Sequence, residues 1–183
     1  IAVVNEFTTL FHSFDPNLVT NINITNTRLT GNWNTFVVDA RGNHFIDSVP
    51  FHTFTSLSLV DPTRNLFVSG NVNQDFNTGL ASGFYNKYSY VSTNATGLTN
   101  LLFLGTLNVD SLGNLANSTL TQQNITANGY TLNLTGNFSL DANGNVTSGT
   151  ISSFTFADNL GHSFVASGAS LNAIDFDHLT DPL

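Results

Sequence analysis

Cysteine is absent from this chain of 183 residues. Its absence excludes disulfide bridges, thiolate metal sites and cysteine nucleophiles. Eukaryotic secreted domains of this size often carry disulfides, whereas bacterial and archaeal surface proteins often do without them. The sequence therefore favours a prokaryotic protein that is extracellular or on the cell surface. Methionine is absent too and the sequence starts at Ile1, which indicates a removed secretion signal or a trimmed chain.

Charged residues are scarce, and basic residues are the scarcest. Lys and Arg together number 4 and Asp and Glu number 12, which gives a net charge of -8 and a charged fraction of 9%. Soluble domains usually reach about 25%. So few basic groups cannot neutralise a phosphate backbone, so nucleic acid is excluded as a partner. No apolar run approaches the roughly 20 residues that span a bilayer, and we expect a protein that does not span a membrane.

The sequence patterns of common enzymes are missing as well. The chain has no Gly-x-Ser-x-Gly elbow, no phosphate-binding glycine loop and no His-Glu-x-x-His, and Glu6 is its only glutamate. Its five histidines show no short metal-ligand spacing apart from His44 and His52, which Pro50 separates. We expect no enzymatic activity and no cofactor. The one exception is Ca²⁺, for which Asp- and Asn-rich turns could supply oxygen ligands if two of them converged.

One short phrase, in contrast, occurs in four copies. Each copy starts with Asp, has Gly three residues later and ends with Asn or His. The copies are residues 39–43, 110–114, 141–145 and 158–162. The Asp side chain can bond the backbone two residues on, and the Gly can adopt a positive φ, so the combination closes tight turns. The pattern predicts a hairpin at each copy.

Apolar and polar residues alternate with period two from residue 18 onward, which is typical of half-buried β-strands. We expect loops at 73–83 and 92–97, one helical turn in the tail 171–183, and strands at 18–24, 33–38, 44–49, 51–60, 66–72, 84–90, 101–109, 114–121, 130–140, 146–156 and 163–169. The sequence therefore predicts one mainly β domain over residues 1–183. Its sheet is expected to be an antiparallel meander or sandwich, or a barrel-like sheet, with hairpin turns.

The N-terminal segment, residues 1–16, has a different pattern. Its apolar residues recur at steps of three and four: Val4, Phe7, Leu10, Phe11 and Phe14. This spacing predicts a short helix, with an extended arm as the competing interpretation. In either form the segment could dock on a neighbouring copy, head to tail, and so build a filament. It could equally cap its own sheet, and the sequence leaves both open.

Aromatic residues gather in one candidate strand. Tyr85, Tyr88 and Tyr90 lie in a single run, and Trp33 is the only tryptophan of the chain. If exposed, these four side chains could form a platform for a ligand such as a glycan or haem. The amphipathic shape of Tyr and Trp also suits half-buried strands, and this second interpretation is a purely structural one.

The C-terminal half contains the phrase Gly-Asn-Phe-Ser-Leu-Asp-Ala-Asn-Gly-Asn-Val-Thr-Ser-Gly-Thr-Ile at residues 136–151. It resembles the β-rich regions of bacterial secreted surface proteins, including those exported by type I systems. Residues 136–160 are also similar to the strand meander of the bacterial hemophores. The latter resemblance implies haem held by a His on an N-terminal loop and a Tyr on the meander. At the strand position that residues 136–137 suggest, this chain has Leu140 in place of the Tyr.

Two classes of function follow from these patterns. The first is an extracellular structural or adhesive protein, a self-associating subunit of a surface fibre or matrix, because long strands with few charges lack the usual lysine guards on sheet edges. The alternative is a secreted ligand-binding module for haem or a glycan. The expected partner is another copy of the chain in the first class and a small ligand in the second.

Overall fold

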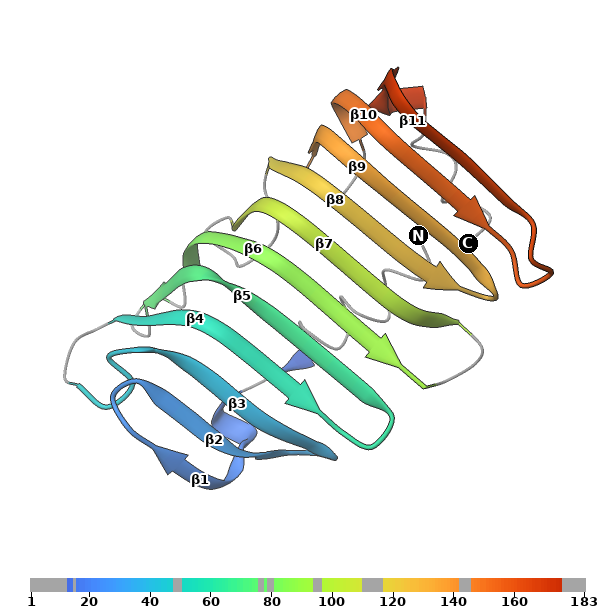
Figure 1. Cartoon of the computed structure of the whole chain (residues 1–183). Helices are drawn as coiled ribbons and strands as arrows, with labels where there is room; N and C mark the ends of the chain where they lie inside the picture. Colours follow the sequence, from blue (N-terminus) through green and yellow to red (C-terminus); the bar gives the residue numbers. More distant parts are fainter. Residues whose placement is uncertain are drawn as a thin grey trace.

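The computed structural model describes residues 13–14, 16–47, 51–75, 78, 81–93, 97–109, 117–141 and 146–175. In this part of the chain, eleven strands form one antiparallel sheet (Figure 1). The spatial order runs from β1 to β11 as in the sequence, so each strand pairs with the strands that precede and follow it. The predicted mainly β fold with a meander topology is confirmed.

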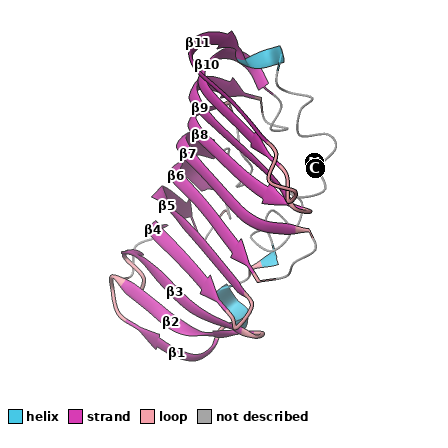
Figure 2. Cartoon of the chain, turned by 45° about the vertical axis from the view of Figure 1, so that its right-hand side comes forward, coloured by secondary structure: helices cyan, strands magenta, loops and turns pink. Residues whose placement is uncertain are grey.

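The strands lengthen from β1 to β5, and all are stacked in sequence order from β1 to β11 (Figure 2). They are β1 (Thr20–Ile24), β2 (Arg28–Trp33), β3 (Phe36–Asn43), β4 (Phe51–Val60), β5 (Arg64–Asp75), β6 (Ala81–Ser92), β7 (Leu98–Val109), β8 (Ser118–Ala127), β9 (Tyr130–Leu140), β10 (Val146–Ala157) and β11 (Ser163–Asn172). A short 3₁₀ helix, η1 (Pro16–Leu18), precedes β1, and one helical turn covers residues 173–175 in the tail. Among the described residues, no helix has the length and apolar character needed to cross a membrane.

The hairpin predicted at residues 158–162 is confirmed. It joins β10 to β11, which pair directly beyond it through Ala157 and Ser163. One carboxylate oxygen of Asp158 accepts hydrogen bonds from the backbone N–H groups of Leu160 and His162, both at 2.9 Å. Gly161 adopts a φ of 89°, the conformation for which the phrase needs glycine. Local turn chemistry therefore determines this connection.

The hairpin predicted at residues 39–43 is wrong, because this phrase lies inside β3. The turn between β2 and β3 falls earlier, at Asn34 and Thr35, and Asn34 takes the positive φ of 53° that a two-residue hairpin needs. Apolar residues at alternate positions of β3 continue into the phrase as far as Ala40, which is buried. Burial of this apolar series outweighs the weak local preference of Asp and Gly for a turn.

The other two copies of the phrase fall largely outside the described residues. Residues 110–114 lie there entirely, between β7 and β8, and of residues 141–145 only Asp141 is described. The strands on either side of this copy, β9 and β10, pair through Leu140 and Val146. The predicted loop at 73–83 is too long, because β5 continues to Asp75 and β6 begins at Ala81. The predicted strand at 44–49 is also wrong for residues 44–47, which form bends after β3.

The core lies on one face of the sheet, where alternate residues of each strand are buried. In β3, for example, Phe36 and Val38 are buried whereas Val37 and Arg41 are exposed. The largest fully buried side chains of the described residues are Tyr90, Phe138, Leu59, Leu66, Leu101, Leu107, Leu120, Leu132, Ile151, Val38 and Val68. Burying one such side chain contributes about 1.5 to 3 kcal/mol, so this face dominates the stability of the sheet.

A band of β-bulges crosses the sheet. The pairing register shifts in every pair from β3–β4 to β10–β11. Glycines lie in or beside this band: Gly42, Gly70, Gly83, Gly105, Gly136 and Gly149. At each of them a Cβ atom would collide with a backbone carbonyl of the adjacent strand, so the strands approach more closely than side chains allow. Bulges and glycines together bend sheets, and the long strands curve toward one end in Figure 1.

Candidate functional site

The tryptophan predicted as a ligand-binding residue belongs to the core. Trp33 is the last residue of β2 and is 4% exposed. Phe14 meets its ring edge-on, with the ring centroids 5.4 Å apart, and Phe36 stacks on it at 5.8 Å. The Trp33 ring is therefore covered by side chains of its own chain. Trp33 therefore anchors the segment before β1 to the sheet.

The three tyrosines of β6 also point into the protein. Tyr88 and Tyr90 are buried, and Tyr85 is partly buried with its ring 5.1 Å from that of Tyr88. Burial raises the pKa of the Tyr85 hydroxyl to about 12 and, together with the neighbouring Tyr85, raises that of Tyr88 further. These tyrosines and Trp33 therefore form no exposed platform. Their positions agree with the second interpretation of the aromatic run, in which Tyr and Trp are half-buried or buried strand residues.

Of the five residues predicted to mediate self-association, the structure describes only one. Phe14 packs on Trp33 of its own chain and on the core cluster. Val4, Phe7, Leu10 and Phe11 lie outside the described residues. Phe14 thus packs on its own sheet. The described residues show no contact that supports the predicted head-to-tail association through residues 1–16.

The turns considered for Ca²⁺ use their carboxylates internally where they are described. Besides the two backbone N–H groups, Asp158 contacts the ring Nδ1 of His162 through its second oxygen at 2.8 Å. This His162 contact, with backbone hydrogen bonds that outweigh desolvation, lowers the pKa of Asp158. Within the described ranges no three His, Asp or Glu side chains gather in a cluster that could hold a metal ion.

Charge is distributed very unevenly over the sheet. All four basic residues, Arg28, Arg41, Arg64 and Lys87, belong to β2, β3, β5 and β6. The five strands from β7 to β11 contain no Lys, Arg, His, Asp or Glu. Their polar residues are Ser, Thr, Asn and Gln instead. Some of these bond to one another across strands: the partly buried hydroxyls of Thr126 in β8 and Thr131 in β9 are 3.1 Å apart. Half of the sheet is therefore polar but uncharged.

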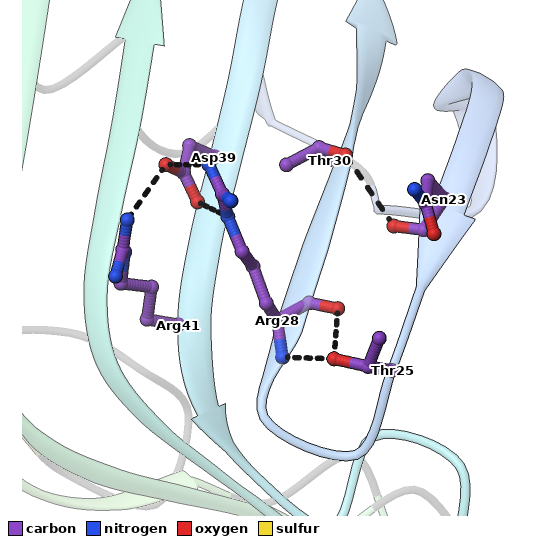
Figure 3. A network of polar contacts seen from close by, with 6 residues as sticks. All are labelled: Asn23, Thr25, Arg28, Thr30, Asp39 and Arg41. Carbon is purple, nitrogen blue, oxygen red and sulfur yellow. Dashed lines mark hydrogen bonds and ion pairs between the residues drawn. The ribbon is translucent and has the colours of Figure 1, made fainter.

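The charged half begins with a polar network on β1, β2 and β3 (Figure 3). Arg28 donates two hydrogen bonds to the carboxylate of Asp39, from Nε at 3.0 Å and from Nη2 at 2.9 Å, and Arg41 approaches the same carboxylate at 3.5 Å. The hydrogen bonds from Arg28 outweigh desolvation and hold the pKa of Asp39 below its ordinary value. The Thr25 hydroxyl accepts from the Arg28 N–H at 3.1 Å and so closes the β1–β2 turn. These contacts attach the short strand β1 to the sheet.

The sheet ends at β11 with an exposed, uncharged strand. β11 pairs with β10 along one side, and no other described strand lies along its second side. Phe164 and Val165 are each 61% exposed, and Leu160 in the preceding turn is 77% exposed. From Ser163 to Asn172 the strand has neither a charged residue nor a proline. Charged residues, prolines and bulges are the devices by which proteins block sheet edges, and of these β11 has only the bulge near Gly168.

The opposite edge, β1, is shorter and less regular. Its five residues are all exposed, and among them Ile22 and Ile24 are apolar. Asn21 takes a positive φ of 51°, and the pairing with β2 shifts register between Thr20 and Asn23. Only the last two residues of β1 therefore continue a regular ladder. Of the two ends of the described sheet, β11 is the better candidate for an interaction site.

Sequence reasoning missed β11 as a candidate site, although it recognised the strand and the general shortage of charge. The missing step was the position of the strand in the sheet, which depends on all the pairings together. The sequence nevertheless held one indication, because no Lys or Arg follows Lys87. Comparison of the chain with protein-family models, with curated proteins and with solved structures found no match.

Proposed function

We propose that the chain is a structural or adhesive protein that acts outside the cell as a self-associating subunit of a surface fibre or matrix. The observation that carries this proposal is the exposed, charge-free edge strand β11 at the end of an uncharged half-sheet. The location outside the cell is supported by composition, since the chain has no cysteine and few charges.

An exposed edge strand presents a row of backbone N–H and C=O groups that another strand can bind. Burying Phe164 and Val165 at such a contact would add a hydrophobic contribution, at about 25 cal/mol for each Å² of apolar surface removed from water. Strand addition therefore needs no pocket and no cofactor. This mode of association suits a protein whose described aromatic residues mostly serve its own core.

The strands β7 to β11 themselves place no charged side chain at a contact on this end of the sheet. Copies with a net charge of -8 repel one another at long range, and six of the twelve acidic residues lie in the segments between these strands or after β11. The second edge, β1, is exposed as well and gives each copy another surface through which an assembly can grow.

Sedimentation velocity over a range of protein concentrations tests the proposal. We expect species larger than the monomer, whose fraction rises with concentration and also when salt is raised from about 0.01 M to 0.15 M, because screening shortens the range of repulsion from roughly 30 to 8 Å. Negative-stain microscopy of the concentrated sample should show extended assemblies. A monomer at every concentration and salt would overturn the proposal, and association that weakens with salt would show that opposite charges drive it instead.

A further inference from the structure

We infer that β11 binds β11 of a second copy in an antiparallel ladder centred on Val165, so that two sheets join into one across a two-fold axis. The inference rests on the proposed self-association and specifies its surface, its partner and its register. The partner is a second copy of this chain.

The sequence of the exposed edge is nearly symmetric about Val165. Residues 163–167 read Ser-Phe-Val-Ala-Ser, and their register with β10 runs without a shift. Antiparallel pairing about Val165 places Ser163 opposite the partner's Ser167 and Phe164 opposite the partner's Ala166. Val165 then lies opposite its own counterpart. A two-fold contact requires this kind of self-complementarity.

The pairing of a large with a small side chain already occurs in the structure. On its β10 side, Ala166 lies opposite Phe154, and Phe164 lies opposite Phe156. A second Phe opposite Ala166 on the free side would repeat an arrangement that the sheet accommodates. Val165 is on the other face, beside Thr155, where a β-branched residue fits a cross-strand pair.

The titratable residues next to β11 are compatible with this register. The titratable residues of the turn before the strand are Asp158 and His162, which contact each other. Asp158 lies opposite His162 across the hairpin, so in the proposed ladder both residues lie level with the partner's Gly168. Gly168 is uncharged, so the partner has no acidic residue level with Asp158 at this position, although the protein as a whole is acidic. The second edge is a poorer partner for β11, because the register shift in β1 limits the ladder it can form.

Cysteine crosslinking tests the register without background, because the chain has no cysteine of its own. Directly opposite residues have Cβ atoms about 4.5 to 5.5 Å apart, close to the distance that a disulfide needs. Val165→Cys should therefore give a covalent dimer on mild oxidation. Val37→Cys is the matched control, since Val37 is 59% exposed but lies on the inner strand β3. We expect about tenfold more dimer from the first variant than from the second.

Two further variants define the direction of the strands. Ser163→Cys alone and Ser167→Cys alone should remain monomeric, because in the proposed ladder each residue lies about 14 Å along the strand from its own counterpart. An equal mixture of the two variants should form dimers. Each variant is first compared with the unmodified chain by thermal melting, and all three positions of β11 are exposed, so loss of folding would not mimic loss of contact.

The outcomes separate this inference from the proposed function. If the unmodified chain associates but Val165→Cys crosslinks no better than Val37→Cys, the β11 contact is wrong and the proposed function stands. Crosslinking of Ser163→Cys and Ser167→Cys each on its own would mean parallel strands and would also overturn the inference. If the unmodified chain remains a monomer, both fail together.

Discussion

Replacing Gly136 by Ala is expected to destabilise the protein by about 3 kcal/mol, an unusually large effect for the addition of one methyl group. Gly136 lies in β9 opposite Ile151, beside the band of bulges. The added Cβ would collide with the carbonyl oxygen of Thr150 and the Cα of Ile151, both of which are backbone atoms of β10. Backbone atoms in a paired strand cannot move aside as a flexible side chain can, so strands β9 and β10 would have to separate.

Gly97→Ala is the matched control for this prediction. Gly97 has a positive φ of 86°, but among the described residues, its chain neighbours aside, no atom lies within 4 Å of the position its Cβ would take. Its replacement should cost about 1 kcal/mol, from backbone conformation alone. Urea unfolding of the two variants and the unmodified chain measures both effects. Equal losses of stability would show that close strand approach is not the reason for glycine at position 136.

Asp61→Asn is expected to cost about 2 to 3 kcal/mol at neutral pH, because the carboxylate is nearly buried and fully used. Its side chain is 3% exposed. One oxygen accepts from the backbone N–H groups of Thr63 and Arg64 at 2.8 and 2.7 Å, and the other accepts from the Arg64 guanidinium at 2.7 and 3.0 Å. This cluster closes the turn between β4 and β5 and holds Arg64 over the ring of Phe36.

The same variant predicts a specific dependence on pH. Burial works against ionisation, but the hydrogen bonds from Arg64 and Thr63 outweigh it and hold the pKa of Asp61 well below its ordinary value of 3.8. The unfolded chain therefore takes up the proton first. The stabilising contribution is complete well above pH 3.8 and declines as pH falls below that value. The difference in unfolding free energy between the unmodified chain and Asp61→Asn should shrink accordingly in acid.

Asp39→Asn provides the comparison for this second prediction. Asp39 also pairs with an arginine, but Arg28 is half exposed and solvent screens the interaction. Its replacement should cost less than about 1 kcal/mol and change little with pH. Urea unfolding at pH 7 and pH 3 measures both variants. A constant difference for Asp61→Asn over this range would contradict the role assigned to its carboxylate.

Local patterns predicted most strands of this protein, because period-two alternation and turn chemistry act within a few residues, but they missed β2 and ran the strand predicted at 33–38 across the turn between β2 and β3. The hairpin at Asp158 is an example, since its Asp and Gly satisfy the turn by themselves. The phrase at Asp39 has the same local signal but lies within a strand whose apolar series is buried. Competition between a local preference and burial is decided by the whole sheet and cannot be judged from five residues.

The proposed interaction site was less predictable than the fold, for a related reason. The sequence of β11 shows a strand without charge, but only the complete order of pairing shows that this strand lies at an edge of the described sheet. The tyrosines of β6 were predicted as either surface or core residues, and their side of the sheet depends on register. Likewise the sequence shows a glycine at position 136 but not the carbonyl of β10 that fills the place of its side chain.

Amide hydrogen exchange at several protein concentrations tests the central claim, that copies join through the edge of β11. Exchange at residues 163–167 should slow as concentration rises, because the backbone N–H groups on the free side of the strand become hydrogen-bonded to a second copy. Amides in the middle of β6, already paired on both sides, serve as the internal reference and should not change. Exchange at residues 163–167 that is the same at every concentration, while larger species form, would contradict the account.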